Sequence, residues 1–266
     1  RGGPPRNVVA PQFGYGEIPP TSRLQEDKAG ASLRSDLALR SLSRYGPLPS
    51  DAELHIEAAL DHSQTAPPAT ELIREGEALN SPRILMAGWA ARVRVFDDGR
   101  RQIVSFFLPG DIFGLSNWPG SRSTTPIVSL TTANYAKIPL LAGTCCCHAQ
   151  ANDRLMFAIG QFLRIEELRL VDQITRMGRT AYERVAHLLL EFYCRLKVIG
   201  FVQSNSYVLP LSQGTLGDAL ALCAVHTNRI LQQLRRDRLI QMHGTIITIP
   251  EVERLMDIAD FRLPLA

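Results

Sequence analysis

The sequence has few cysteines, no long apolar run and little net charge. Its 266 residues include 5 cysteines, none of them before residue 145, which excludes a disulfide scaffold. Mainly apolar stretches such as Ile103 to Leu108 are far shorter than the roughly 18 residues needed to span a bilayer. The front of the chain also shows no secretory signal pattern. We therefore expect a soluble, cytoplasmic protein without a membrane partner.

Sequence patterns of the common enzyme classes are also absent. There is no Gly-x-Ser-x-Gly, His-Glu-x-x-His, P-loop or Rossmann glycine pattern, so we expect no enzymatic activity. The formal net charge of +3 does not by itself indicate a nucleic-acid binder. What the chain does have is 45% apolar residues, enough for a sizeable core in one or two domains.

Proline and glycine are concentrated at the front of the chain. Residues 1–50 hold 7 prolines and 6 glycines, so we predict that residues 1–31 form a disordered tail. Structural signals begin with Ser50-Asp-Ala-Glu53, a capping-box pattern that predicts a short helix over 50–61.

Short β-rich runs follow, within a predicted domain at 32–145. They are Ile84 to Met86, Ala91 to Phe96 and Gln102 to Leu108, and Asp98-Gly99 between the last two favours a hairpin. Short strands at this spacing indicate an antiparallel sandwich, roll or barrel.

Helical periodicity then begins, and we predict a long helix at 146–178 with Asn152-Asp153 as its cap. At 100° per residue, eight apolar residues fall within about 120° of arc: Leu155, Met156, Ile159, Phe162, Leu163, Leu170, Ile174 and Met177. A second, partly apolar face carries Phe157, Ile165, Leu168 and Val171. We expect one face to cover the β domain and the other a second subunit. The alternative is a helix buried within one subunit.

The last segment, 179–261, has the order of a winged helix. Helices are predicted at Glu183 to Leu196, Ser212 to Leu220 and Val225 to Arg236, followed by a hairpin through His243-Gly244. Residues 179–243 contain eight Arg or Lys against four acids, so this segment carries +4 while the whole chain carries +3. A solvated helix face explains some such clusters. Because this basic cluster occurs together with a helix-turn-helix pattern, neutralisation of DNA phosphates is the better interpretation.

Two blocks resemble the Crp/Fnr family of bacterial transcription regulators. One runs from Ala87-Gly-Trp-Ala90 through Asp98-Gly-Arg-Arg-Gln-Ile103 to Leu108-Pro-Gly-Asp-Ile-Phe-Gly-Leu115. The other includes Leu209-Pro-Leu-Ser-Gln213 and Val225-His-Thr-Asn-Arg-Ile-Leu-Gln-Gln-Leu-Arg235. The resemblance implies an α+β fold: an antiparallel β-roll like that of cyclic-nucleotide-binding domains and cupins, a long dimerisation helix, and a C-terminal winged helix-turn-helix. Double-stranded DNA at a palindromic promoter site, a second copy of the chain and RNA polymerase are the implied partners.

The base-reading residues that the resemblance implies lie at the start of the second motif helix. Arg229 and His226 are predicted to read bases, Val225 to touch a thymine methyl group, and Asn228 to read a base or contact phosphate. For His226 the alternative is a structural role without a DNA contact. Arg235 and Arg236 are expected to hold the DNA backbone, and Ser212 to cap the first motif helix and bond a phosphate.

No cofactor is expected. Leu115 stands where cyclic-nucleotide binders of the family have Glu, and Ser123-Thr124 where they have Arg-Ser, so a phosphate would lack its Arg. The family's iron–sulfur sensors use N-terminal cysteines, which this chain lacks.

The cysteines that are present have other interpretations. The adjacent Cys145, Cys146 and Cys147 lack the spacing of a cluster or zinc site, so we interpret them as small residues at a domain edge. Cys223, at the start of the second motif helix, is a candidate redox switch, since oxidation there would disturb DNA binding.

The main rival hypothesis is a cyclic-nucleotide-type ligand-binding module whose winged helix mediates protein contacts.

Overall fold

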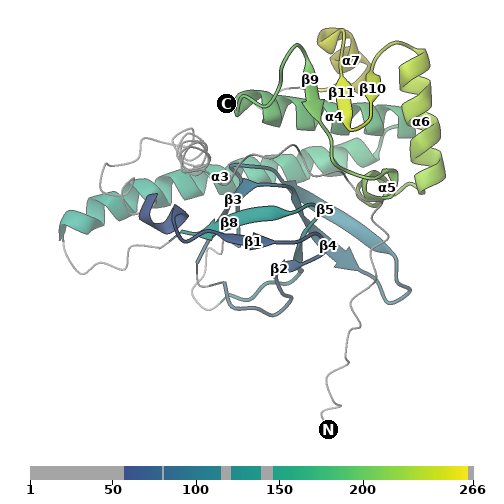
Figure 1. Cartoon of the computed structure of the whole chain (residues 1–266). Coiled ribbons are helices and arrows are strands. Elements are labelled where there is room, and N and C mark those ends of the chain that lie inside the picture. Colours follow the sequence, from purple (N-terminus) through teal and green to yellow (C-terminus); the bar gives the residue numbers. More distant parts are fainter. Residues whose placement is uncertain (1–56, 80, 115–120, 139–145, 263–266) are drawn as a thin grey trace.

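In a computed structural model of the chain, the described residues are 57–79, 81–114, 121–138 and 146–262 (Figure 1). For residues 146–156, 158 and 159 the description is of the backbone alone. The predicted tail and residues 50–56 of the predicted first helix lie outside these ranges. Residues 57–60 of that helix are helical.

Eight strands build the N-terminal part as two antiparallel sheets, with strand orders β1-β8-β3-β6 and β2-β7-β4-β5. The strands are β1 (Gln64–Ala66), β2 (Glu71–Ile73), β3 (Arg83–Ala87), β4 (Ala90–Val95), β5 (Arg101–Phe107), β6 (Ile112–Phe113), β7 (Ile127–Ser129) and β8 (Ala133–Lys137). We call this part the sensor roll. The predicted antiparallel β-roll is therefore confirmed.

The predicted hairpin joins β4 to β5. Val95 pairs with Arg101, and the turn between them contains Gly99 at φ +81°, a conformation that L-residues with a side chain rarely adopt. This hairpin is long, and its tip residues Val95 and Phe96 are exposed.

The sheet that contains β4 and β5 is buried on both faces. Ala90 and its partner Phe107 point into the roll, whereas the next pair, Ala91 and Phe106, points to the opposite face. That opposite face packs on helix α4 (Ala181–Val198), where Phe192 makes edge contacts with Trp89 and Phe106 at 4.9 and 5.0 Å. One hydrophobic core therefore runs from the sensor roll into the C-terminal part.

The long predicted helix is present as α3 (Cys146–Met177). The prediction that Asn152 and Asp153 cap it was wrong, because the helix begins six residues earlier. The intervening Ala149, Gln150 and Ala151 are strong helix formers and no Gly or Pro interrupts them.

In the structure, the two predicted faces of α3 do not separate into one buried and one exposed side. Phe162 is buried, but Ile174 from the same predicted stripe is 74% exposed. On the second face Phe157 and Val171 are exposed. Arg169 of α3 pairs with Asp111 of the roll at 3.6 Å, and Arg176 pairs with Glu191 of α4 at 3.0 Å.

Helix α4 begins with a capping box that the sequence analysis missed. Thr180 accepts from the backbone of Glu183, and the Glu183 side chain accepts from the backbone of Thr180.

The remaining elements are β9 (Ser206–Val208), α5 (Gln213–Leu220), α6 (Ala224–Arg236), β10 (Gln241–His243), β11 (Ile246–Thr248) and α7 (Val252–Ala259). The predicted C-terminal hairpin is β10–β11, and β9 adds an unpredicted third strand to it. Of the described helices, none combines the length and apolarity needed to cross a membrane.

Candidate nucleic-acid interface

Helices α5 and α6 form a helix-turn-helix whose first helix starts as predicted. Ser212 is the N-cap of α5, and its Oγ accepts from the backbone N–H of Thr215 at 3.1 Å. Ala221 ends α5 in the left-handed conformation, and two residues later Cys223 begins α6. The chain therefore turns sharply between the two helices.

Helix α6 has one buried and one exposed side. Its buried residues are Thr227, Ile230, Leu231 and Leu234, which recur at the spacing of a helix face. At about 100° per residue, Val225, Arg229, Gln232 and Arg236 lie on the opposite side. Val225 is 80% exposed, so its side chain is accessible to a partner.

Gln232 is not among the residues that the sequence predicted. The predicted base contacts lie only in the first turns of the helix, although Val225, Arg229 and Gln232, spaced by four and three residues, share one helix face. Gln232 is exposed, and a Gln amide is suited to bidentate bonding with adenine.

The other predicted residues lie at the edges of this exposed side. His226 and Asn228 are half-buried, and Arg235 is exposed. Arg235 donates to Gln232 at 3.1 Å, and Gln232 donates to Asn228 at 3.5 Å. These contacts order the exposed side of α6 before any ligand is bound.

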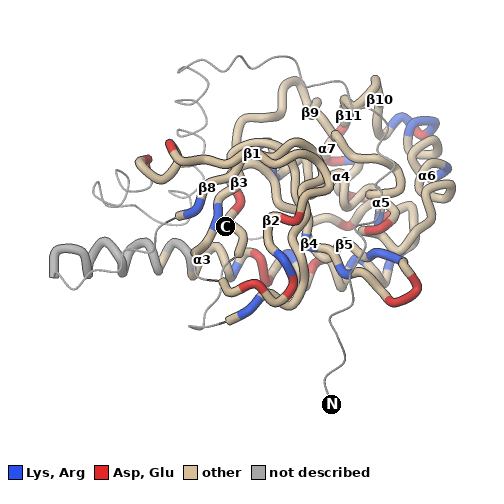
Figure 2. The backbone as a smooth tube through the Cα atoms, turned by 60° about the horizontal axis from the view of Figure 1, so that its bottom comes forward, with Lys and Arg blue, Asp and Glu red and all other residues tan. Residues whose placement is uncertain are grey.

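Positive charge on α6 and just beyond its end is not neutralised within the described chain. Arg229, Arg235, Arg236 and Arg238 are exposed, and none pairs with an acidic side chain in the ranges that the structure describes. The neighbouring Asp237 instead accepts from the hydroxyl of Tyr182 at 2.6 Å. Figure 2 shows the basic segments of α6 at the outer edge of the molecule, open to an anionic partner.

The wing lies next to the start of α5. Gly244, at φ +59°, makes the tight turn between β10 and β11. A groove of about 450 Å³ lies between this turn and α5, and Ser212, Gly214 and Thr245 contribute to its lining. The groove exposes the first turn of α5 beside the wing, so both elements can contact the same stretch of a nucleic-acid backbone.

Cys223 is an exposed thiol at the N-cap of α6, and it makes no capping hydrogen bond there. Cys194 differs: it is half-buried against the core, and burial raises the pKa of its thiol to about 11. The side chains of Cys145, Cys146 and Cys147 lie outside the described part. Among the described residues, no cluster of three or more His, Cys, Asp or Glu is arranged to hold a metal ion.

Two family models match the chain, one on each part. Residues 63–141 match the cyclic nucleotide-binding domain, and residues 183–258 match the Crp-like helix-turn-helix domain. Together they cover more than half of the chain, in the order of the sensor roll and the winged helix.

Similar proteins agree with both matches. The transcriptional activatory protein AadR of Rhodopseudomonas palustris is 28% identical over 233 residues, 86% of this chain and 91% of that protein. The nitrogen fixation regulation protein FixK of Bradyrhizobium diazoefficiens is 31% identical over 167 residues, 62% of this chain and 65% of that protein. The solved structure of FixK2 from Bradyrhizobium japonicum superposes with a TM-score of 0.61 at 27% identity, covering 74% of this chain and 96% of that one.

The chain belongs to the Crp/Fnr family of transcriptional regulators. DNA-binding regulation of transcription, which the sequence predicted, is therefore its function.

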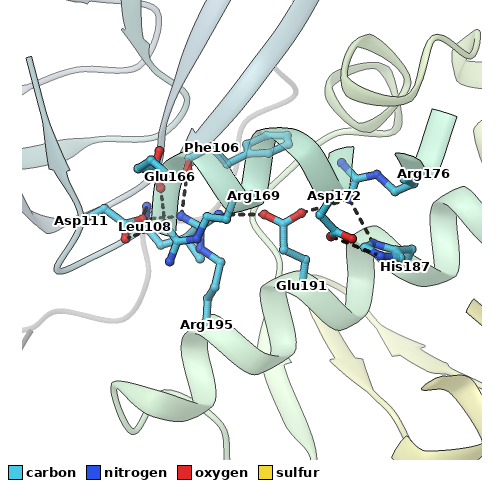
Figure 3. Close-up of polar contacts among 10 residues, drawn as sticks. All are labelled: Phe106, Leu108, Asp111, Glu166, Arg169, Asp172, Arg176, His187, Glu191 and Arg195. Carbon is cyan, nitrogen blue, oxygen red and sulfur yellow. Dashed lines mark hydrogen bonds and ion pairs between the residues drawn. The ribbon is translucent and has the colours of Figure 1, made fainter. Parts of the chain in front are cut away.

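In this Crp/Fnr regulator, a buried ionic network joins the sensor roll to α3 and α4 (Figure 3). Arg195 of α4 donates to the carboxylate of Asp111, in the turn after β5, and to the carbonyl oxygen of Phe106 at 2.8 Å. Arg176 of α3 and Arg195 both pair with Glu191, at 3.0 and 2.9 Å. Each charged group in the network thus has an opposite charge beside it.

The two glutamates of the network have opposite pKa shifts. Burial raises the pKa of Glu191, but Arg176, Arg195 and Arg169 outweigh this effect and bring its pKa down to about 2. For Glu166, which pairs with Arg169, burial and the nearby Asp111 prevail and its pKa is raised.

His187 extends the network toward the end of α3. The Nη1 of Arg176 lies 3.4 Å from Nδ1 of His187, and Asp172 Oδ2 lies 3.3 Å from Nε2. A guanidinium can only donate, so Nδ1 accepts and Nε2 carries the hydrogen that faces Asp172. The ring orientation of this buried histidine is therefore fixed from both sides.

Proposed function

We propose that this Crp/Fnr regulator binds a palindromic promoter site as a homodimer and regulates transcription from it. The observation that carries the proposal is the exposed side of α6, which combines a solvent-exposed Val225 with uncompensated arginines. Such a face suits the major groove, where base edges are read by apolar and bidentate contacts.

The proposed roles follow from position on α6. Arg229 and Val225 face outward near the start of the helix and are assigned to base edges, with Gln232 one turn later. His226 and Asn228, at the edges, are assigned to flanking bases or phosphates. Arg235, Arg236 and Ser212 are assigned to the phosphate backbone.

Dimerisation is proposed through α3. Phe157 and Val171, 58% and 55% exposed, share one side of this helix with the half-buried Leu168. Gly160 lies on the same side, and a Cβ added there would meet nothing within 4 Å. A glycine in an exposed helix interior costs up to about 1 kcal/mol relative to alanine, and close approach of a second helix explains its presence.

The dimer can be tested by mass. The full chain should have twice its mass of 29.5 kDa in light scattering at micromolar concentration. Val171→Glu should shift it toward the monomer, because two carboxylates would be buried at the axis. The matched control is Val95→Glu, on the exposed hairpin tip. A monomeric wild type, or equal effects of both variants, would contradict the proposed interface.

The sensor roll is proposed to work without cyclic nucleotide or iron–sulfur cluster. Ser123, at the position expected for the phosphate-binding Arg, donates to the carbonyl oxygen of Thr125. The adjacent Arg122 is bound to the carbonyl of Gly76 at 2.7 Å. Phe107 and Phe113 fill the roll interior. These residues do not fit a buried cyclic phosphate. Leu115 lies outside the described residues.

Two further expectations belong to the proposal. RNA polymerase is the expected protein partner, and no catalytic activity is expected.

A mobility-shift assay tests the proposal. The full chain is used to select a site from random duplex DNA, and its binding is measured at about 100 mM salt. We expect a palindrome with half-sites about one helical turn apart, and affinity that falls steeply with salt. A chain that selects no sequence would refute the proposal and favour a winged helix that contacts protein.

A further inference from the structure

Helix α5 is short and intrinsically weak. It contains Gly214 and Gly217, and glycine is among the poorest helix formers. Gly217 is required, because a Cβ there would lie 2.3 Å from the carbonyl oxygen of Leu222. Asp218 also places a negative charge in the last turn, at the unfavourable end of the helix dipole. This helix therefore depends on contacts from outside.

The sensor roll supplies such contacts at the end of α5. Arg101 of β5 pairs with Asp218 at 2.8 Å, and Gln102 donates to the carbonyl of Ala219 at 3.4 Å. The next carbonyl, of Leu220, accepts from Arg184 of α4 at 2.9 Å. We call the first two interactions the β5–α5 contact. They satisfy a carbonyl and a carboxylate that α5 itself leaves without partners.

The charge of Asp218 depends on this contact. Burial raises the pKa of the Asp218 carboxyl, and Arg101 opposes that rise. Without Arg101 a half-buried carboxylate would face the end of the helix dipole uncompensated. The pair is still about one-quarter to one-third exposed, at 25% and 32%, so it can break without opening the core.

The end of α5 determines where α6 starts. Only Ala221, Leu222 and Cys223 separate the two helices, and the N–H of Leu222 donates back to Gly217. Cys223 provides no side-chain cap for α6. The first turn of α6 is therefore placed mainly by α5 and this turn.

We propose that Arg101 and Gln102 of the sensor roll are positioning residues for DNA binding, which fix the end of α5 and thereby the orientation of α6. The inference rests on the proposed function. A change that displaces Arg101 or Gln102 is therefore transmitted to the recognition helix of the same subunit, without either side chain contacting DNA.

The test measures the affinity of the full chain for its selected DNA site. Arg101→Gln and Asp218→Asn should each weaken binding about three- to tenfold. The charge swap Arg101→Asp with Asp218→Arg should restore affinity to within about twofold. Arg100→Gln is the matched control, because Arg100 is on the same hairpin but pairs with Asp98. This variant should bind like wild type.

A second readout separates positioning from a direct DNA contact. Amide hydrogen exchange in the last turn of α5 should speed up in Arg101→Gln and Asp218→Asn but not in Arg100→Gln. The inference is overturned if Arg101→Gln weakens binding but Asp218→Asn does not, or if the charge swap does not restore binding. It is also overturned if amide exchange in α5 is the same in both variants as in wild type. A wild-type chain that selects no DNA site would instead refute the proposed function.

Discussion

The guanidinium of Arg195 on α4 is bound to the carboxylate of Asp111 in the sensor roll, and each side chain is about nine-tenths buried. Asp111 also accepts from the backbone N–H of Leu108 at 2.7 Å. The pair fixes α4 to the turn after β5. It provides a polar contact between sensor and DNA-binding parts next to their shared core.

Removing either partner should destabilise the protein. Asp111→Ala leaves a buried guanidinium with less compensation, and we expect the free energy of unfolding in urea to fall by about 3 kcal/mol. Arg100→Gln, which breaks an exposed pair, should change it by less than about 1 kcal/mol. Equal losses in both variants would show that the buried pair has no special role.

The stability contributed by Glu191 should depend on pH. Its pKa is about 2 in the folded protein, below the ordinary value of 4.5 that the unfolded chain has. The stabilisation is therefore fully present above about pH 4.5, and it is lost as the pH falls toward 2. The shift corresponds to about 3 kcal/mol.

The experiment compares wild type with Glu191→Gln across this range. Urea unfolding should show the variant less stable at pH 7, with the difference shrinking as the pH falls below about 4.5. A difference that stays constant from pH 7 to pH 3 would contradict the ionic role of Glu191.

Arg229 and Arg236 should differ in what they contribute to DNA binding. Arg229→Ala should cost about 1–3 kcal/mol of binding free energy at the selected site and relax the preference at one base pair. Arg236→Ala should weaken binding to all sequences alike and reduce the salt dependence by about one counterion. Titrations with matched and mismatched duplexes at several salt concentrations distinguish the two. Identical profiles for both variants would contradict the assignment.

Oxidation of Cys223 should weaken DNA binding. The thiolate sulfur attacks hydrogen peroxide, so that an S–O bond forms as the O–O bond breaks and the leaving hydroxide is protonated to water. The sulfur is oxidised to a sulfenic acid, which adds a polar group at the start of α6. Binding by wild type should fall after treatment, whereas Cys223→Ser should keep its affinity. Cys194→Ala serves as the control and should remain sensitive. Equal loss in wild type and Cys223→Ser would place the effect on another thiol.

Local patterns were enough to predict much of the fold. The Asp98-Gly99 turn predicted the β4–β5 hairpin, and the apolar spacing predicted α6, because both depend on residues close in the chain. Ser212 was predicted as a cap for the same reason.

The contacts between the parts could not be predicted in this way. Asp111 and Arg195 are 84 residues apart, and nothing in either local sequence specifies the other. Arg101 and Asp218 are 117 residues apart and meet only in the packed fold. The burial of Arg169 and Arg176 on α3 could not be predicted either, since their partners Asp111 and Glu191 lie on other elements.

The core shared by β4, β5 and α4 limits how this regulator can be divided. A cut after residue 178 would leave Phe192 and its neighbours on one fragment, and Trp89 and Phe106 on the other, each with an apolar surface in water. A chimera that grafted this DNA-reading part onto another regulator's input part would aggregate unless the new roll reproduced the same sheet face. The two parts are therefore constrained to change together, as one folding unit.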